Sequence, residues 1–196
     1  EGYEYSEEQI DNSKLSIEEA LNSLGFSMDN SLKDMVGLKV YETSEVTLKD
    51  TLGIEDELFS MQEELVKISD YNRIARLYGV QTFELKDNEY MIICNVEDTI
   101  AMRNEGLSNN TPITIKGKSY IPKYKECREG YIMMALDPQN FGIVLIPDEA
   151  VDESMASAEV LAGNYRGSSK EEIQEIENEI EKIGDRKSTR LNSSHL

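Results

Sequence analysis

The sequence predicts an α+β fold, with a mainly antiparallel sheet, flanking helices and a charged, stalk-like C-terminal helix. Short apolar or alternating runs separated by turn residues are typical of antiparallel strands. Other segments repeat apolar residues every three or four positions, as amphipathic helices do. The 196 residues, 39 % hydrophobic and 30 % charged, are enough for one sizeable core and too charged for a membrane-embedded chain.

Two helices are predicted in the first half of the chain. Ser16 and Glu19 form a capping box, and Gly25 is a natural end for the helix that follows. Ser69 is a candidate N-cap for a second helix over Asp70–Tyr78. We therefore expect one helix before and one helix after the first strands along the chain.

Alternating and apolar runs predict the strands. In chain order they are Gly37–Tyr41, Glu45–Leu48, Leu65–Ile68, Gln81–Lys86, Tyr90–Val96, Ile113–Ile115, Ser119–Ile121, Tyr131–Leu136, Gly142–Ile146 and Glu159–Gly163. Asp87-Asn88 and Lys116-Gly117-Lys118 should close two hairpins. The eighth and ninth runs are the most continuously apolar, so they are predicted to form a central pair, and the tenth a possible edge strand.

The C-terminal part contains the clearest helix, Lys170–Ile183. Its isoleucines, Ile173, Ile176, Ile180 and Ile183, form a stripe narrow enough to suit pairing with a single neighbouring helix. Residues 186–196 resemble a translated cloning sequence, and we exclude them as a foreign tail. The expected organisation is a linker over residues 1–15, a domain over 16–167 and a helix over 168–185.

The charge of the chain restricts its partners. With 39 acidic and 20 basic residues, the formal net charge is −19. The electrostatic field of a chain with this charge repels phosphate backbones and anionic lipids and attracts cations and cationic peptides. Nucleic acid is therefore not an expected partner.

The sequence offers no constellation for catalysis, a metal or a cofactor. The single histidine, His195, lies in the excluded tail, and no glycine-rich phosphate-binding loop is present. Cys94 and Cys127 have no neighbouring cysteine, and buried apolar side chains are the favoured interpretation of both. A paired-carboxylate hydrolase is possible by residue type, but no positioned partner supports it. We expect no enzyme activity.

Four acidic residues that follow an apolar run are the candidate ligand contacts. Asp148, Glu149, Asp152 and Glu153 could form the rim of a site for a cationic ligand. The alternative interpretation is a solvated helix start, because acidic side chains favour the positive end of a helix. Both interpretations stay open at this point.

Four segments resemble a known family in their order along the chain: Ile68–Leu77, Leu85–Ile92, Glu126–Tyr131 and Gly142–Asp148. Together they are similar to the large extracellular domain of FtsX-like ABC-transporter permeases, of the bacitracin-export BceB type. The resemblance covers about residues 16–165 and consists of structural segments without a ligand motif.

The resemblance implies an extracellular sensing or substrate-binding domain of a membrane permease involved in peptide-antibiotic resistance or cell-envelope transport. The linker would then come from a preceding membrane helix, and the last helix would lead towards the next one. The implied partners are the rest of the permease, a separate ATPase subunit, a sensor histidine kinase, and cationic peptides or cell-wall lipid–peptide complexes. The implied location is the outer face of a bacterial cell membrane. The alternative is a free-standing extracellular lipoprotein or adhesion module.

Overall fold

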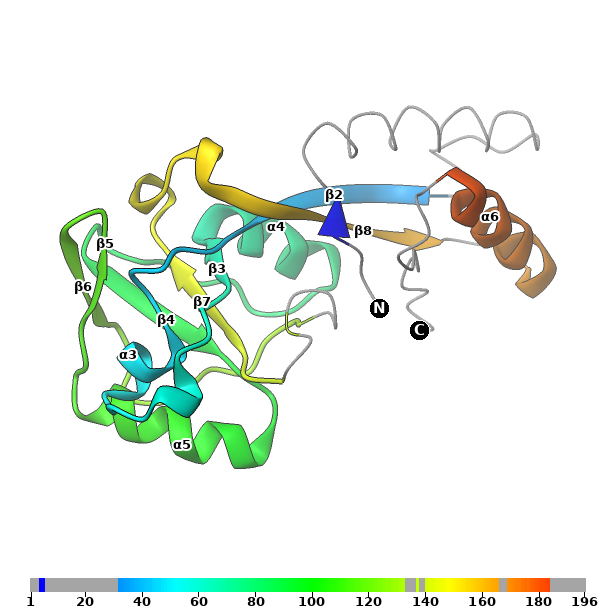
Figure 1. Ribbon diagram of the computed structural model, residues 1–196. Helices are drawn as coiled ribbons and strands as arrows, with labels where there is room; N and C mark the ends of the chain where they lie inside the picture. Colours follow the sequence, from blue (N-terminus) through cyan, green and yellow to red (C-terminus); the bar gives the residue numbers. More distant parts are fainter. Residues whose placement is uncertain (1–3, 6–31, 133–136, 138–139, 166–168, 184–196) are drawn as a thin grey trace. The chain divides into compact units, whose positions relative to one another are not determined.

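The structure, a computed structural model, describes residues 4–5, 32–132, 137, 140–165 and 169–183 (Figure 1). The chain divides into two compact units. One unit is Lys39–Ser157, and the other consists of the two flanking segments, Glu1–Leu38 and Ala158–Leu196. The helix predicted after Ser16, most of the predicted linker and the tail at 186–196 lie outside the described residues.

The Lys39–Ser157 unit is an α+β structure built on a mixed sheet. Its strands are the end of β2 (Leu32–Tyr41), β3 (Leu65–Lys67), β4 (Glu89–Ile93), β5 (Ile113–Ile115), β6 (Lys118–Pro122) and β7 (Ile143–Ile146). The strand order is β2-β3-β7-β4-β6-β5. Because β3 pairs with β7 in parallel, and β4 with β6, the expected mainly antiparallel sheet is corrected to a mixed one.

Helices flank this sheet. They are α3 (Leu48–Leu52), α4 (Ile68–Leu77), α5 (Glu97–Ser108) and the short 3-10 helices η1 (Glu57–Phe59), η2 (Asp148–Ala150) and η3 (Glu153–Met155). Helix α4 contacts β3 and β7, whereas α3 and α5 contact each other. The core lies where β4 and β7 pair, since β7 is buried along its whole length and β4 along all but its first residue.

The second unit contains β1 (Glu4–Tyr5), β8 (Ala156–Tyr165) from Ala158 onward, the start of β2 and helix α6 (Lys170–Ile183). Strand β8 lies between β1 and β2 in the sheet order. The run Glu159–Gly163 is therefore an inner strand and not the expected edge strand. Helix α6 has the predicted bounds, and the side chains of Ile176, Ile180 and Ile183 are outside the described set.

Several predicted elements are confirmed with small shifts. Gly37–Tyr41 lies in β2, and β3 is followed directly by α4, which begins one residue before the predicted N-cap Ser69. The β5–β6 hairpin turns at Lys116 and Gly117, which both have positive φ angles of 51° and 75°. Positive φ at both central residues is the geometry of the turns that close two-residue hairpins.

The segment Glu45–Leu48 is not a strand. Thr47 and Asp50 form a reciprocal capping box, with the Thr47 N–H donating to the Asp50 carboxylate at 2.7 Å, and helix α3 begins at Leu48. Gly53 ends the helix in the left-handed conformation, with φ of 68°. The capping residues therefore start a helix where the alternating apolar residues Val46 and Leu48 predicted a strand.

One further strand prediction fails, and another lies mostly outside the described residues. Gln81–Lys86 forms no strand, because the Asn72 side chain makes both backbone hydrogen bonds of Phe83 and takes the place of a partner strand. Residues 131–132 are not in a strand, and residues 133–136 lie outside the described part. The expected central pair is wrong, since the neighbours of β7 are β3 and β4.

Candidate functional site

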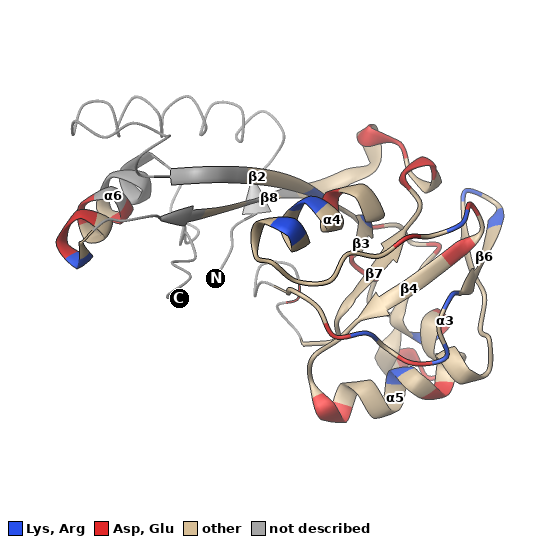
Figure 2. Cartoon of the chain, turned by 180° about the vertical axis from the view of Figure 1, so that it is seen from behind, with Lys and Arg blue, Asp and Glu red and all other residues tan. Residues whose placement is uncertain are grey.

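The four predicted acidic residues lie in the turns between β7 and β8. Asp148 and Glu149 belong to η2, Asp152 precedes η3, and Glu153 begins η3. All four are exposed. Acidic residues also lie along α5 and α6, as Figure 2 shows. The site prediction therefore concerns one part of a broadly acidic surface.

Glu153 is tied to the sheet beneath it by three polar side chains. Its carboxylate pairs with the Lys39 ammonium at 2.8 Å and with Lys67, and it accepts a hydrogen bond from the Tyr41 hydroxyl at 3.1 Å. The hydrogen bonds from Lys39 and Lys67 lower the pKa of Glu153 from 4.5 to about 2. Burial and the nearby Glu153 charge raise the pKa of Tyr41. The Glu153 charge is thus largely compensated within the domain.

Asp148 and Asp152 also have partners inside the Lys39–Ser157 unit. Asp148 accepts a hydrogen bond from the Ser69 N–H at 3.1 Å, in the first turn of α4, where a negative charge is favourable. Asp152 pairs with Lys116 in the β5–β6 turn at 2.5 Å. These contacts fasten the turns to the neighbouring elements. Glu149 raises the pKa of Tyr120, whose burial contributes more to that shift. Ligand contact at the four acids stays a prediction.

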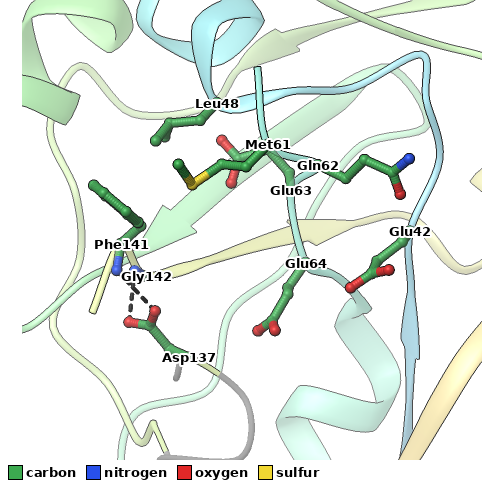
Figure 3. A pocket seen from close by; sticks show the side chains of 9 residues that line it. All are labelled: Glu42, Leu48, Met61, Gln62, Glu63, Glu64, Asp137, Phe141 and Gly142. Atoms are coloured by element: carbon green, nitrogen blue, oxygen red, sulfur yellow. Dashed lines mark hydrogen bonds between the residues drawn. The ribbon is translucent and has the colours of Figure 1, made fainter. Parts of the chain in front are cut away.

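A cavity of about 90 Å³ lies elsewhere in the same unit, lined by residues that no sequence pattern singled out (Figure 3). Leu48, Met61 and Phe141 provide its apolar lining, and Gln62 and Gly142 also line it. The acidic lining is Glu42, Glu63, Glu64 and Asp137. A single water needs roughly 10–15 Å³ by this measure, so the cavity is larger than a one-water hole.

Asp137 fixes one wall of this cavity. Its carboxylate accepts hydrogen bonds from the Phe141 N–H at 2.7 Å and from the Gly142 N–H at 2.6 Å, which are the dashed lines in Figure 3. The φ of Gly142 is 84°, and an added Cβ would lie 2.4 Å from the Ile93 carbonyl oxygen. A glycine is therefore required where this wall meets β4.

A buried ionic network lies behind the cavity. Arg103 of α5 is fully buried and donates to both Glu63 carboxylate oxygens, to the Thr51 hydroxyl at 2.7 Å and to the Phe141 carbonyl oxygen at 3.0 Å. The interaction with Glu63 opposes the cost of burial and holds the pKa of Arg103 above its usual value. The Glu63 charge is therefore neutralised, while Glu42, Glu64 and Asp137 line the rest of the acidic side.

The two cysteines are free thiols in the core region. Cys94 is fully buried, and Cys127 packs against the same cluster of apolar side chains. Burial raises the pKa of both thiols, that of Cys127 to about 12. Protonated thiols are poor nucleophiles and poor metal ligands. Within the described ranges, no group of three His, Cys, Asp or Glu residues is placed to hold a metal ion.

A second hollow, of about 550 Å³, follows α4 and the chain at residues 83–85. Arg73 and Arg76 line it together with Asp70 and Glu84. Arg73 pairs with Asp70 at 2.6 Å. Because both signs of charge are present, this hollow has no evident preference for a charged ligand.

No protein-family model matches this sequence, and no curated protein is significantly similar to it. In the described part of the chain, no helix has the length and apolar character to cross a membrane.

Proposed function

We propose that this chain is an extracellular sensing or substrate-binding domain of an FtsX-like ABC-transporter permease involved in peptide-antibiotic resistance. Its partners are the remaining permease, a separate ATPase subunit and a sensor histidine kinase. Its ligands are cationic peptides or lipid–peptide complexes met outside the membrane. The domain binds and does not itself catalyse a reaction.

One observation carries the proposal, the ordered resemblance of four segments to such permeases. These segments fall on adjacent parts of one unit. The first is helix α4, the second runs into β4, and the fourth contains β7. The third includes Arg128, whose backbone forms a parallel bridge with Ile93 of β4. A resemblance concentrated on packed elements supports a related fold, and the ligand has to be argued from the charge.

The organisation of the chain is compatible with a domain inserted between two membrane helices. The first and last described elements, β1 and α6, belong to the same unit. The Lys39–Ser157 unit lies between the two segments that form it. First and last described elements that share one unit are expected of a domain inserted between two membrane helices. The isoleucine stripe of α6 supports a stalk that pairs with another helix.

The ligand class follows from electrostatics. A domain of net charge −19 attracts cationic peptides at long range, and the attraction is screened beyond about 8 Å at roughly 0.15 M salt. Only close contacts should persist at physiological salt. The exposed acids Asp148, Glu149, Asp152 and Glu153 remain the predicted contact on this surface. Since three of them hold lysines or a backbone N–H of the domain, a ligand would have to compete with those partners.

Whether the chain is part of a permease is tested with the full-length protein in its native membrane. After mild detergent extraction, we expect an ATPase subunit to co-purify with the protein. This co-purification should depend on the membrane segments that flank the chain. Recovery without any ATPase, as a lipid-anchored or secreted protein, would support the alternative of a free-standing lipoprotein or adhesion module.

The ligand test is a calorimetric titration of the 196-residue chain with a cationic antimicrobial peptide and with zinc–bacitracin, at low and physiological salt. The variant changes the four acids to amides. The control changes the exposed acids Glu84, Glu97, Asp98 and Glu105 to amides, because this removes the same charge elsewhere. We expect weaker binding only in the first variant at physiological salt. Equal binding by both variants would remove the four acids from the site.

A further inference from the structure

The segment between α3 and β3 exposes large apolar side chains. Leu58 is 78 % exposed, Ile54 37 % and Met61 36 %, so one short segment carries three of the five large exposed apolar side chains of the described residues. The other two are Val96 and Ile121. A grouping of this kind is a feature of interaction surfaces, whereas scattered single residues are ordinary.

This segment is fastened at several points. The Asp56 carboxylate accepts a hydrogen bond from the Leu58 N–H at 3.0 Å, and Lys49 pairs with Glu57 at 2.8 Å. The Leu48 N–H donates to the Met61 carbonyl oxygen at 2.9 Å. These bonds hold η1 against α3 while the Leu58 side chain points to solvent. The apolar surface is therefore preorganised, which reduces the entropy lost on binding.

The surroundings of this segment are acidic. Residues 54–66 contain five acids, Glu55, Asp56, Glu57, Glu63 and Glu64, and no lysine or arginine. Lys49 compensates Glu57, and Arg103 compensates Glu63. The remaining charge favours a cationic partner and disfavours an anionic lipid surface or a second copy of this chain, itself of charge −19.

Met61 connects the exposed segment to the cavity. It lines the cavity together with Leu48 and Phe141, and Figure 3 shows Glu42 and Glu64 on the other side from Phe141. An apolar wall beside carboxylates matches the two parts of a lysine side chain, which has an apolar stem and a charged head. The cavity and the exposed side chains therefore fit one kind of ligand.

We propose that Ile54, Leu58 and Met61, with the adjoining acid-lined cavity, form the docking surface for a cationic amphipathic peptide. Apolar residues of the peptide cover Leu58 and Met61, and one of its ammonium groups enters the cavity between Glu42, Glu64 and Asp137. The inference rests on the proposed function for its ligand class, and it adds a second contact whose residues are separate from Asp148, Glu149, Asp152 and Glu153.

The test uses the full 196-residue chain and a synthetic amphipathic helix made of leucine and lysine. Affinity is measured by calorimetry at low salt and at roughly 0.15 M salt, where diffuse attraction is screened. Because the peptide buries the Leu58 and Met61 side chains, Leu58→Gln with Met61→Gln should weaken binding at least tenfold. Glu42→Gln with Glu55→Gln should also weaken it and lower its salt dependence.

Matched controls separate this surface from general effects. Ile121 on β6 is 38 % exposed, close to the 36 % of Met61, so Ile121→Gln removes an exposed apolar side chain elsewhere and should leave the affinity unchanged. Glu97→Gln with Asp98→Asn removes the same charge from the start of α5 and should have little effect. A lysine–glycine peptide of equal charge should bind more weakly, and a leucine–glutamate peptide should not bind.

Each outcome decides one question. If the peptide binds and loses affinity only when Asp148, Glu149, Asp152 and Glu153 are changed, the docking surface is wrong and the proposed function stands. If no cationic peptide binds at either salt concentration, both fail. Binding to phosphatidylcholine vesicles that requires Leu58, without peptide binding, would overturn the inference in favour of a membrane contact.

Discussion

Arg103 and Glu63 form a two-pronged ion pair in the interior of the Lys39–Ser157 unit. The Arg103 Nη2–Glu63 Oε2 distance is 2.9 Å, and Arg103 Nη1 donates to Glu63 Oε1. The same Arg103 nitrogen reaches the Thr51 hydroxyl, and Arg103 Nε reaches the Phe141 carbonyl oxygen. One residue of α5 thus joins α3, the segment before β3 and the chain entering β7.

Removing one partner of this pair should destabilise the protein strongly. Arg103→Met or Glu63→Gln leaves a buried group without its counterion, which costs roughly 3–5 kcal/mol of unfolding free energy. Urea denaturation measures the loss. The Arg73–Asp70 pair, whose arginine is exposed, is the control, and Arg73→Met should cost only about 0–1 kcal/mol. Equal losses at the two sites would contradict a structural role for the buried pair.

Gly106 allows α5 to approach α3. A Cβ at this position would lie 2.3 Å from the Thr51 carbonyl oxygen and 3.0 Å from the Leu52 Cα. Gly106→Ala should therefore destabilise the protein by about 1–3 kcal/mol, although alanine raises helix propensity by about 1 kcal/mol. Ala101→Gly, at an exposed position of α5, measures the propensity effect alone. A more stable Gly106→Ala variant would show that the backbones separate easily.

The α+β class and most strands could be predicted because their apolar residues follow regular periods. Helix α5 could not be predicted in this way, because its buried residues do not form an apolar face. They are Thr99, Arg103, Gly106 and Leu107. The buried face of α5 carries Arg103, whose partner Glu63 lies 40 positions away. No local pattern contains that information.

The candidate site shows the same limit. Exposure of the four acids follows from composition and turn position, but their partners Lys39, Lys67 and Lys116 come from three distant segments. The cavity lining is also assembled from separate segments. The acidic residues around Leu58 and Met61 are the one part of these sites that is grouped in the sequence. The exposure of the Leu58 and Met61 side chains follows only from the structure.

The thiols should react slowly in the folded protein. Burial raises the pKa of Cys127 to about 12 and also raises that of Cys94, so little thiolate exists at pH 8. An aromatic disulfide reagent should modify both cysteines rapidly only after unfolding in urea. The Cys127→Ser variant assigns the remaining reaction to Cys94. Rapid modification of both thiols in the native protein would contradict their burial.

The Glu153 carboxylate should link stability to acidic pH. Lys39 and Lys67 lower its pKa in the folded protein to about 2, below the usual 4.5. A depressed folded-state pKa gives stability that is present above about pH 4.5 and lost as the pH falls towards 2. Because the Glu153 side chain is 56 % exposed, solvent screening limits the contribution to about 0.2–1 kcal/mol.

Glu153→Gln tests this linkage by urea denaturation at pH 6 and pH 3. The variant should be less stable than the parent at pH 6. The difference should shrink at pH 3, because the carboxylate of the unfolded parent is then largely protonated and folding has to release that proton. Glu149→Gln, in the same acidic cluster, is the control and should leave the pH dependence unchanged. Parallel stability curves for parent and Glu153→Gln would mean that Lys39 and Lys67 do not hold this carboxylate in solution. Glu153 would then be available to a cationic ligand.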